Sequence, residues 1–169
     1  MPTAIPHAQH PAMRWRPAPA RARALSAGVL ALCTAAVALA QPAAPAPAPA
    51  TTDVSFATQV LHAVNLHRQR HQLPALQPAP WLATLAAEHS AHMAQLGRLS
   101  HTGFQTRFLR ARRQTCVENL AAGFRQADRL VQGWQASPSH HQNLLDPRVQ
   151  DVGVASINGH VTWLACSAD

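Results

Sequence analysis

Two apolar segments near the C-terminal end flank Asn158-Gly159, and this arrangement constrains the fold more than any other feature of the chain. The segments cover residues 152–157 and 160–166. Asn-Gly between apolar residues predicts a two-residue hairpin turn, because both residues readily adopt the positive φ angles that such a turn needs. The sequence therefore predicts a pair of antiparallel strands at this end of the chain.

Apolar residues recur at helical spacing over much of the preceding chain. The pattern predicts helices over residues 54–72, 80–96 and 126–136, and a short buried strand over residues 115–122. Pro80 suits the first position of a helix, and Gly97 suits the residue that follows one. Leu76, in a proline-rich connector, is expected in the core. Helices packed on a small antiparallel sheet make the predicted fold class α+β.

The first forty residues have the features of an export signal. Four arginines precede the apolar segment Ala24–Ala40, which ends in an A-x-A cleavage pattern. The alternative is a membrane anchor, because these 17 residues are at the lower limit for a span. A lipid anchor at Cys33 is less consistent, since a leucine precedes that cysteine. We expect a secreted or periplasmic protein, or a membrane-tethered one if the segment is retained. The predicted parts are a signal peptide at residues 1–40, a Pro/Ala-rich linker at 41–52 and a folded domain at 53–169.

The charge of the chain argues against one class of partner. The net charge is +7 overall, but only ten arginines and seven acidic residues follow Ala40, so the exported part carries about +3. This balance does not indicate nucleic-acid binding. One cluster of arginines predicts either a patch for anionic lipid headgroups or cell-wall polymer, or a solvated helix face. Its members are Arg107, Arg110, Arg112 and Arg113.

Two cysteines, Cys116 and Cys166, follow the predicted signal. Two cysteines in an exported domain most simply form one disulfide. This bond would close a loop of about 50 residues, which chain-entropy arguments credit with roughly 4 kcal/mol of stability. The alternative is a pair of buried free thiols.

Residues 134–145 place two histidines beside the end of a helix. Ser137-Pro138 ends that helix, because the residue before proline avoids the helical conformation. His140 and His141 follow this break, and two leucines then return the chain to the core. The segment suits a functional site or, alternatively, a buried hydrogen-bonded turn.

The chain lacks the short motifs of several enzyme classes. It has no G-x-S-x-G, P-loop, H-E-x-x-H or C-x-x-C sequence, so serine hydrolase, nucleotide-binding and zincin interpretations have no support. His89 and His92 are three residues apart on a predicted helix and could share a metal. Ordinary core or surface positions are the more consistent interpretation for both.

Four short motifs occur in a recognisable order. They are Asn65-x-x-Arg68, His101-Thr102, Glu118-Asn119-Leu120-Ala121, and Trp134 followed by Ser137-Pro138-x-His140-x-x-Asn143. Together they resemble the CAP superfamily in its short bacterial form. These SCP-domain proteins include cysteine-rich secretory proteins, venom antigen 5 and plant pathogenesis-related proteins. The resemblance extends from about Phe56 to Cys166 and implies an α-β-α sandwich.

The resemblance also implies a site. Many members line a central cleft with two histidines and two acidic residues, and some bind a divalent metal such as zinc through the histidines. His101 and His140 match the two histidines and would be the metal ligands, while Glu118 matches one acid. The same three residues are the catalytic candidates. Four further motif residues are expected to have a cleft or structural role. They are Asn119, Ser137, Asn143, as a cap for the peptide groups of its own segment, and Trp134, as a core residue.

Two departures limit what the resemblance implies. Asp128 is the only carboxylate between Glu118 and Asp146, so the second acid has no clear counterpart, and Val117 replaces the usual glycine. A two-histidine site leaves most of a metal's coordination shell to water, so we expect weak binding and less support for metal-assisted hydrolysis. A structural interpretation has Glu118 accepting hydrogen bonds from backbone N–H groups of the segment around His140.

The sequence therefore predicts an exported binding or interaction module with a His/Glu-lined cleft. One alternative is a metal-dependent hydrolase that uses the same residues. Another is a non-catalytic structural domain of the cell envelope. The resemblance implies lipids, including sterols, cell-envelope components or metal ions as ligands, and we expect a monomer. No cofactor follows from the residues alone.

Overall fold

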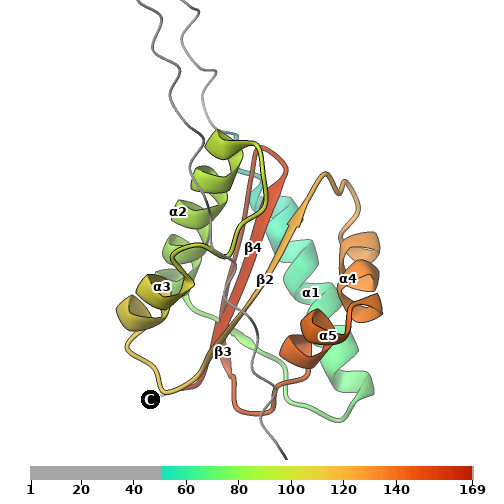
Figure 1. Cartoon of the computed structure of the whole chain (residues 1–169). Coiled ribbons are helices and arrows are strands. Elements are labelled where there is room, and N and C mark those ends of the chain that lie inside the picture. The colour runs from blue at the N-terminus through green and yellow to red at the C-terminus, as the bar shows by residue number, and fades with distance from the viewer. Residues whose placement is uncertain (1–50, 169) are drawn as a thin grey trace, which may run out of the picture. The chain divides into compact units, whose positions relative to one another are not determined.

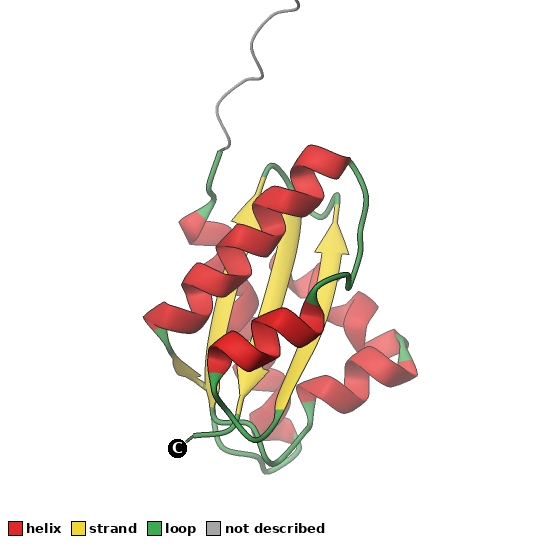
Figure 2. Cartoon of the chain, turned by 60° about the vertical axis from the view of Figure 1, so that its left-hand side comes forward, coloured by secondary structure: helices red, strands yellow, loops and turns green. Residues whose placement is uncertain are grey.

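The computed structural model describes residues 51–168, and the predicted signal peptide and most of the predicted linker lie outside them. The described chain forms a four-stranded sheet in the order β1-β3-β4-β2 with helices on both faces (Figures 1 and 2). In chain order the elements are α1 (Val54–Arg70), β1 (Gln77–Pro78), α2 (Pro80–Leu96), α3 (Phe104–Ala111), β2 (Cys116–Ala122), α4 (Ala127–Ala136), α5 (Pro138–Leu144), β3 (Asp151–Ile157) and β4 (His160–Cys166). The predicted α+β class is confirmed.

The sheet separates two apolar cores. Helices α1, α4 and α5 pack on one face of the sheet, and α2 and α3 pack on the other (Figure 1). Successive side chains of β4 point to opposite faces of the sheet, so Trp163 lies in the first core and Leu164 in the second. Because helices cover this central strand on both faces, β4 is almost continuously buried and largely apolar.

The predicted hairpin forms between β3 and β4, and its turn residues Asn158 and Gly159 have φ angles of 47° and 74°. Strand β2 joins the other edge of β4 with Cys116 directly opposite Cys166. These two cysteines form the disulfide, so the free-thiol alternative is wrong.

The helix ends follow local signals. Asp53 caps α1 by accepting a hydrogen bond from the backbone N–H of Phe56 at 2.9 Å. Pro80 begins α2, and Gly97 ends it in the left-handed conformation with a φ of 61°. Helix α1 ends at Arg70, two residues earlier than predicted, and Gln72 already has a positive φ.

The segment after Pro138 differs from the turn that the sequence predicts. Ser137 is extended and ends α4 as expected, but Pro138 begins a second short helix, α5. The fixed φ angle of proline and its missing N–H are compatible with a first helical position, which explains the new start. His140 and His141 are therefore consecutive helical residues, and their side chains point about 100° apart around the axis.

Helix α2 and strand β3 approach so closely that only glycine fits between them. A Cβ atom built on Gly153 would lie 2.1 Å from the carbonyl carbon of Leu82 and 2.3 Å from the nitrogen of Ala83. This contact is with backbone, which cannot move aside as a side chain can. Gly153 therefore fixes the spacing between α2 and the sheet.

Backbone pairing begins at Thr51, two residues before the predicted start of the folded domain. Thr52 forms an isolated bridge with Ile157, and the carbonyl of Thr51 accepts a hydrogen bond from the N–H of Asn158 at 3.1 Å. Within residues 51–168, no helix combines the length and the apolar character needed to cross a membrane.

Candidate functional site

Glu118 lies at the centre of a buried ion pair. It points from β2 with only 5% of its surface exposed, and Arg107 of α3 is 7% exposed. Arg107 donates from Nε to Oε2 at 2.7 Å and from Nη2 to Oε1 at 2.8 Å. This two-point contact satisfies both carboxylate oxygens and fixes their plane.

His101 makes the third contact with the same carboxylate. Its Nδ1 lies 2.9 Å from Oε1 of Glu118. An ionised carboxylate only accepts hydrogen bonds, so Nδ1 carries the proton and Nε2 of the neutral ring is left with a lone pair. The side chain of His101 is 56% exposed. The geometry therefore presents an oriented imidazole nitrogen that solvent can reach.

Two expectations about this region are wrong. Arg107 belongs neither to a surface patch nor to a solvated helix face, because it is buried against Glu118. Nor does Glu118 accept hydrogen bonds from backbone N–H groups around His140, because Arg107 and His101 occupy it. Two other arginines of the cluster contact different partners. Arg110 pairs with Glu88, and Arg113 lies over the ring of Trp81.

His140 is half-buried on α5, close enough to His101 for the two to interact electrostatically. Burial lowers the pKa of His140 below its usual value, and the neighbouring His101 lowers this pKa further. Both effects favour the neutral imidazole, which is the metal-binding form. The structure thus brings His101 into contact with Glu118 and within electrostatic range of His140.

The remaining motif residues hold the surrounding elements together. Fully buried Asn119 donates to the carbonyl of His140 at 3.1 Å, which ties β2 to α5. Asn143 donates to the carbonyl of Glu118 at 3.2 Å and to Oδ1 of Asn119 at 2.9 Å, and so does not cap its own segment. Trp134 is a core residue, as predicted, and its indole N–H donates to the carbonyl of Leu120 at 3.0 Å. Ser137 is the extended residue between α4 and α5 and makes no side-chain cap.

Asn65 and Arg68 also have structural contacts. The amide of Asn65 bonds both the N–H and the carbonyl of Leu76, which fixes the connector after α1. Arg68 is 1% exposed, and its guanidinium donates to four backbone carbonyls. These belong to Pro74, Leu144, Asp146 and Val149. Arg68 therefore connects the end of α1 with the end of α5 and the loop that follows.

His89 confirms the more ordinary interpretation offered for it. Its ring is 4% exposed, and its Nε2 lies 2.8 Å from the carbonyl of Ser100, where it acts as the donor. His92 is exposed and lies beside it on α2. The ring of His89 thus links α2 to the loop before α3 through this hydrogen bond.

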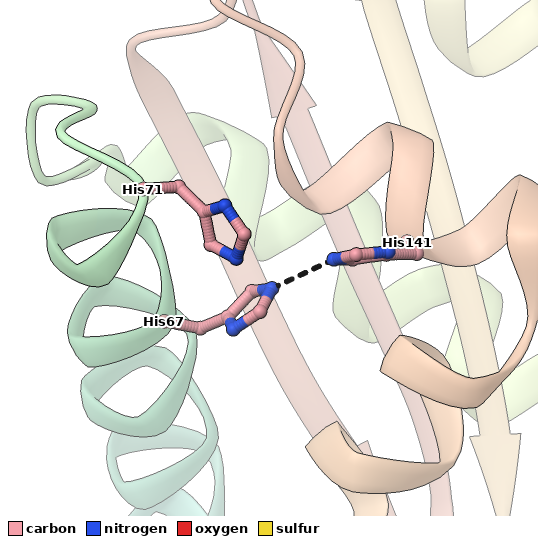
Figure 3. A group of neighbouring side chains, drawn as sticks. All are labelled: His67, His71 and His141. Carbon is pink, nitrogen blue, oxygen red and sulfur yellow. Dashed lines mark hydrogen bonds between the residues drawn. The ribbon is translucent and has the colours of Figure 1, made fainter.

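The sequence analysis missed a group of three histidines on the opposite side of α5. His67 and His71, from the end of α1, lie next to His141 (Figure 3). The available signal was the four-residue spacing of His67 and His71, which puts both on one helix face. Nothing in the sequence placed His141 beside them, because that contact depends on how α5 packs.

A groove lies between α1, α2 and strand β3. It encloses about 550 Å³ and its lining is largely apolar. The lining includes Ala57, Leu61, Ala83, Ala87, Val152 and Val154.

Comparisons with known proteins agree with this architecture. The model of the cysteine-rich secretory protein family, CAP, matches residues 61–166. An extracellular SCP-domain protein of Bacillus anthracis superposes with a TM-score of 0.63 and 27% identity, over 68% of this chain and 41% of that one. The fold is therefore that of an SCP domain. The chain belongs to the cysteine-rich secretory protein family.

Two further structures share the fold at lower identity. A cysteine-rich secretory protein of Staphylococcus aureus has a TM-score of 0.62 and 15% identity, over 68% of this chain and 38% of that one. An outer surface protein of Borrelia burgdorferi has a TM-score of 0.61 and 18% identity, over 72% of this chain and 100% of that one. The chain spans less than half the length of the Bacillus and Staphylococcus proteins. No curated protein matches the chain in sequence.

Proposed function

We propose that this chain is an exported binding module, and that His101 and His140 are its ligand-binding residues. The observation that carries the proposal is the engagement of both carboxylate oxygens of Glu118 by Arg107 and His101. A carboxylate can act as a general base only when it is free to accept a proton from a substrate or water. Glu118 instead orients the ring of His101 and so acts as a positioning residue.

The chemistry of these two imidazoles suits a divalent metal such as zinc. Zinc accepts neutral histidine nitrogens, and metal-binding histidines commonly donate their other N–H to a carboxylate, as His101 does to Glu118. Two protein ligands leave further coordination positions to water or to a carboxylate or phosphate of a binding partner. The site is therefore suited to reversible binding of a metal or of a metal-bridged partner.

The metal-dependent hydrolase has less support. A second carboxylate beside the histidines would support hydrolysis, and Asp128 is the one carboxylate between Glu118 and Asp146. Asp128 is exposed and borders a different cavity, lined also by His62 of α1 and Arg129 of α4. Asp146 is paired with Arg148 at 2.6 Å.

Export is supported by three observations. A basic segment precedes an apolar one at the N-terminus, Cys116 and Cys166 form a disulfide, and two of the similar structures are described as extracellular or outer-surface proteins. Stable disulfides are typical of oxidising compartments outside the cytoplasm.

Calorimetric titration of the full chain with Zn²⁺ tests the metal-binding role. We expect His101→Ala/His140→Ala to remove one binding step from the isotherm, because both ligands are lost. His62→Ala/His92→Ala, which alters two exposed histidines elsewhere, should leave that step intact. Identical isotherms for the wild-type chain and the His101→Ala/His140→Ala variant would refute the assignment.

The groove between α1 and α2 favours a second candidate function, the binding of a lipid chain. Its volume of about 550 Å³ lies within the usual range of small-molecule sites, roughly 300–1,000 Å³. The apolar lining matches an acyl chain rather than a polar ligand. This role is independent of His101 and His140, which do not line the groove.

A fluorescent fatty acid tests the second candidate directly. We expect the full chain to bind it, and Ala83→Leu to weaken binding at least several-fold by filling the groove. Ala136→Leu makes the same change on an exposed face of α4 and should have no effect. Equal binding by all three chains, or binding lost with His101→Ala/His140→Ala, would argue against the groove.

A further inference from the structure

Three imidazole rings from two helices converge at one point on the molecule. His67 lies in the last turn of α1, His71 follows that helix directly, and His141 lies on α5. The Nε2 atoms of His67 and His141 are 3.0 Å apart, and one nitrogen of each of the three rings lies within 4.8 Å of the others. Figure 3 shows the rings facing a common space.

The backbone holds these rings in place. His67 and His71 are four residues apart and share the face of α1 that meets α5. Arg68, between them, donates to the carbonyls of Leu144 and Asp146 at 2.9 and 3.1 Å and so anchors the end of α5. The buried Arg68 therefore holds His67 and the end of α5 together, while His71 adds an exposed ring at the end of α1.

The surroundings of His67 favour its neutral imidazole form. Burial lowers the pKa of His67 below its usual value, and His71, His141 and Arg70 lower it further through charge repulsion. Without a metal, the contact between His67 and His141 requires one ring nitrogen to carry a proton and the other to accept it. A metal ion would replace that proton and use both lone pairs.

We propose that His67, His71 and His141 form a second metal site, which binds a borderline transition-metal ion such as Zn²⁺ through three imidazole nitrogens. Tetrahedral zinc with Zn–N bonds of about 2.0–2.1 Å needs ligand nitrogens roughly 3.3 Å apart. His67 and His141 already approach that separation, and exposed His71 needs a small side-chain rotation. The exposure of His71 leaves the fourth coordination position open to solvent.

This site is separate from the one formed by His101 and His140. His140 and His141 are consecutive residues of α5, so their side chains point about 100° apart, and His141 points towards His67 of α1 (Figure 3). The two sites therefore share a helix but no ligand. The second site does not depend on the proposed function and can be tested without it.

Zinc titration of full-length His101→Ala tests the proposal, because this background disables the other site and leaves α5 unaltered. We expect one Zn²⁺ to bind in this background. Adding His71→Ala removes a direct metal ligand. Loss of a residue that only hydrogen-bonds to a ligand typically weakens metal binding about 10–100-fold, so we expect a larger loss here. His62→Ala, an exposed histidine on the same helix, is the matched control and should change nothing. His71 is itself exposed, so its removal should preserve the fold, which circular dichroism checks.

Electron paramagnetic resonance of the Cu²⁺-loaded His101→Ala chain provides a second readout. We expect hyperfine splitting from imidazole nitrogens that is reduced by His71→Ala and by His141→Ala. Zinc binding that His71→Ala leaves unchanged would overturn the proposal. Zinc binding by the wild-type chain but not by His101→Ala would overturn it too, while leaving the His101–His140 site standing.

Discussion

Arg107→Met should lower the free energy of unfolding by about 3 kcal/mol, the lower end of the range of about 3–5 kcal/mol for breaking a buried ion pair. The variant leaves Glu118, with a side chain 2% exposed, without its guanidinium partner. His101 still contacts the carboxylate, which places the expected loss at the lower end. Chemical denaturation of the full chain measures it.

Two further variants test whether the loss of stability in Arg107→Met comes from an unpaired buried charge or from a general effect on α3. Arg110→Met makes the same change on the same helix but breaks an exposed pair with Glu88, so we expect little change in stability. Arg107→Met/Glu118→Gln removes both charges and should be less destabilised than Arg107→Met alone. If Arg107→Met and Arg110→Met were equally stable, Arg107 would not be needed to neutralise Glu118.

The double variant Cys116→Ala/Cys166→Ala should lose about 4 kcal/mol of unfolding free energy, because the unfolded chain regains the entropy of an open loop. The bond joins residues 50 apart and staples β2 to β4, with Cys166 completely buried. Denaturation under oxidising conditions measures the loss.

A reducing agent provides the control for the disulfide. It should destabilise the wild-type chain by a similar amount and leave Cys116→Ala/Cys166→Ala unaffected. Equal stability of the oxidised wild type and the double variant would contradict a stabilising role for the bond.

Features that depend on local chemistry could be predicted from the sequence. Asn158-Gly159 and Gly97 adopt the positive φ angles expected of them, and Pro80 begins a helix. The pairing of Cys116 with Cys166 followed once their strands were placed in one sheet. A few neighbouring residues determine the turn and the helix ends, whereas the disulfide follows from the presence of only two cysteines after the predicted signal.

Features that depend on how distant elements pack could not be predicted in this way. Arg107 appeared as one of several surface arginines, because nothing in the sequence pairs α3 with the buried Glu118 of β2. His141 gave no sign of approaching α1, and Gly153 gave no sign of touching α2. Helix α5 was missed because Pro138 can either end one helix or begin the next.

The site combines residues that lie in the sequence motifs with one that does not. His101, Glu118 and His140 lie in the motifs that resemble the CAP superfamily, whereas Arg107 lies outside them and holds the carboxylate of Glu118. With its carboxylate held by a guanidinium, the site presents imidazole nitrogens to a ligand and has no free carboxylate. Glu118 therefore positions His101 and is not itself a base for hydrolysis.

The most direct measurement is anomalous diffraction at the zinc absorption edge from crystals of the full chain grown with Zn²⁺. The binding-module proposal predicts a zinc peak bonded to Nε2 of His101 and to His140, with Glu118 still held by Arg107. A zinc ion bonded directly to Glu118, or no zinc beside His101, would contradict it.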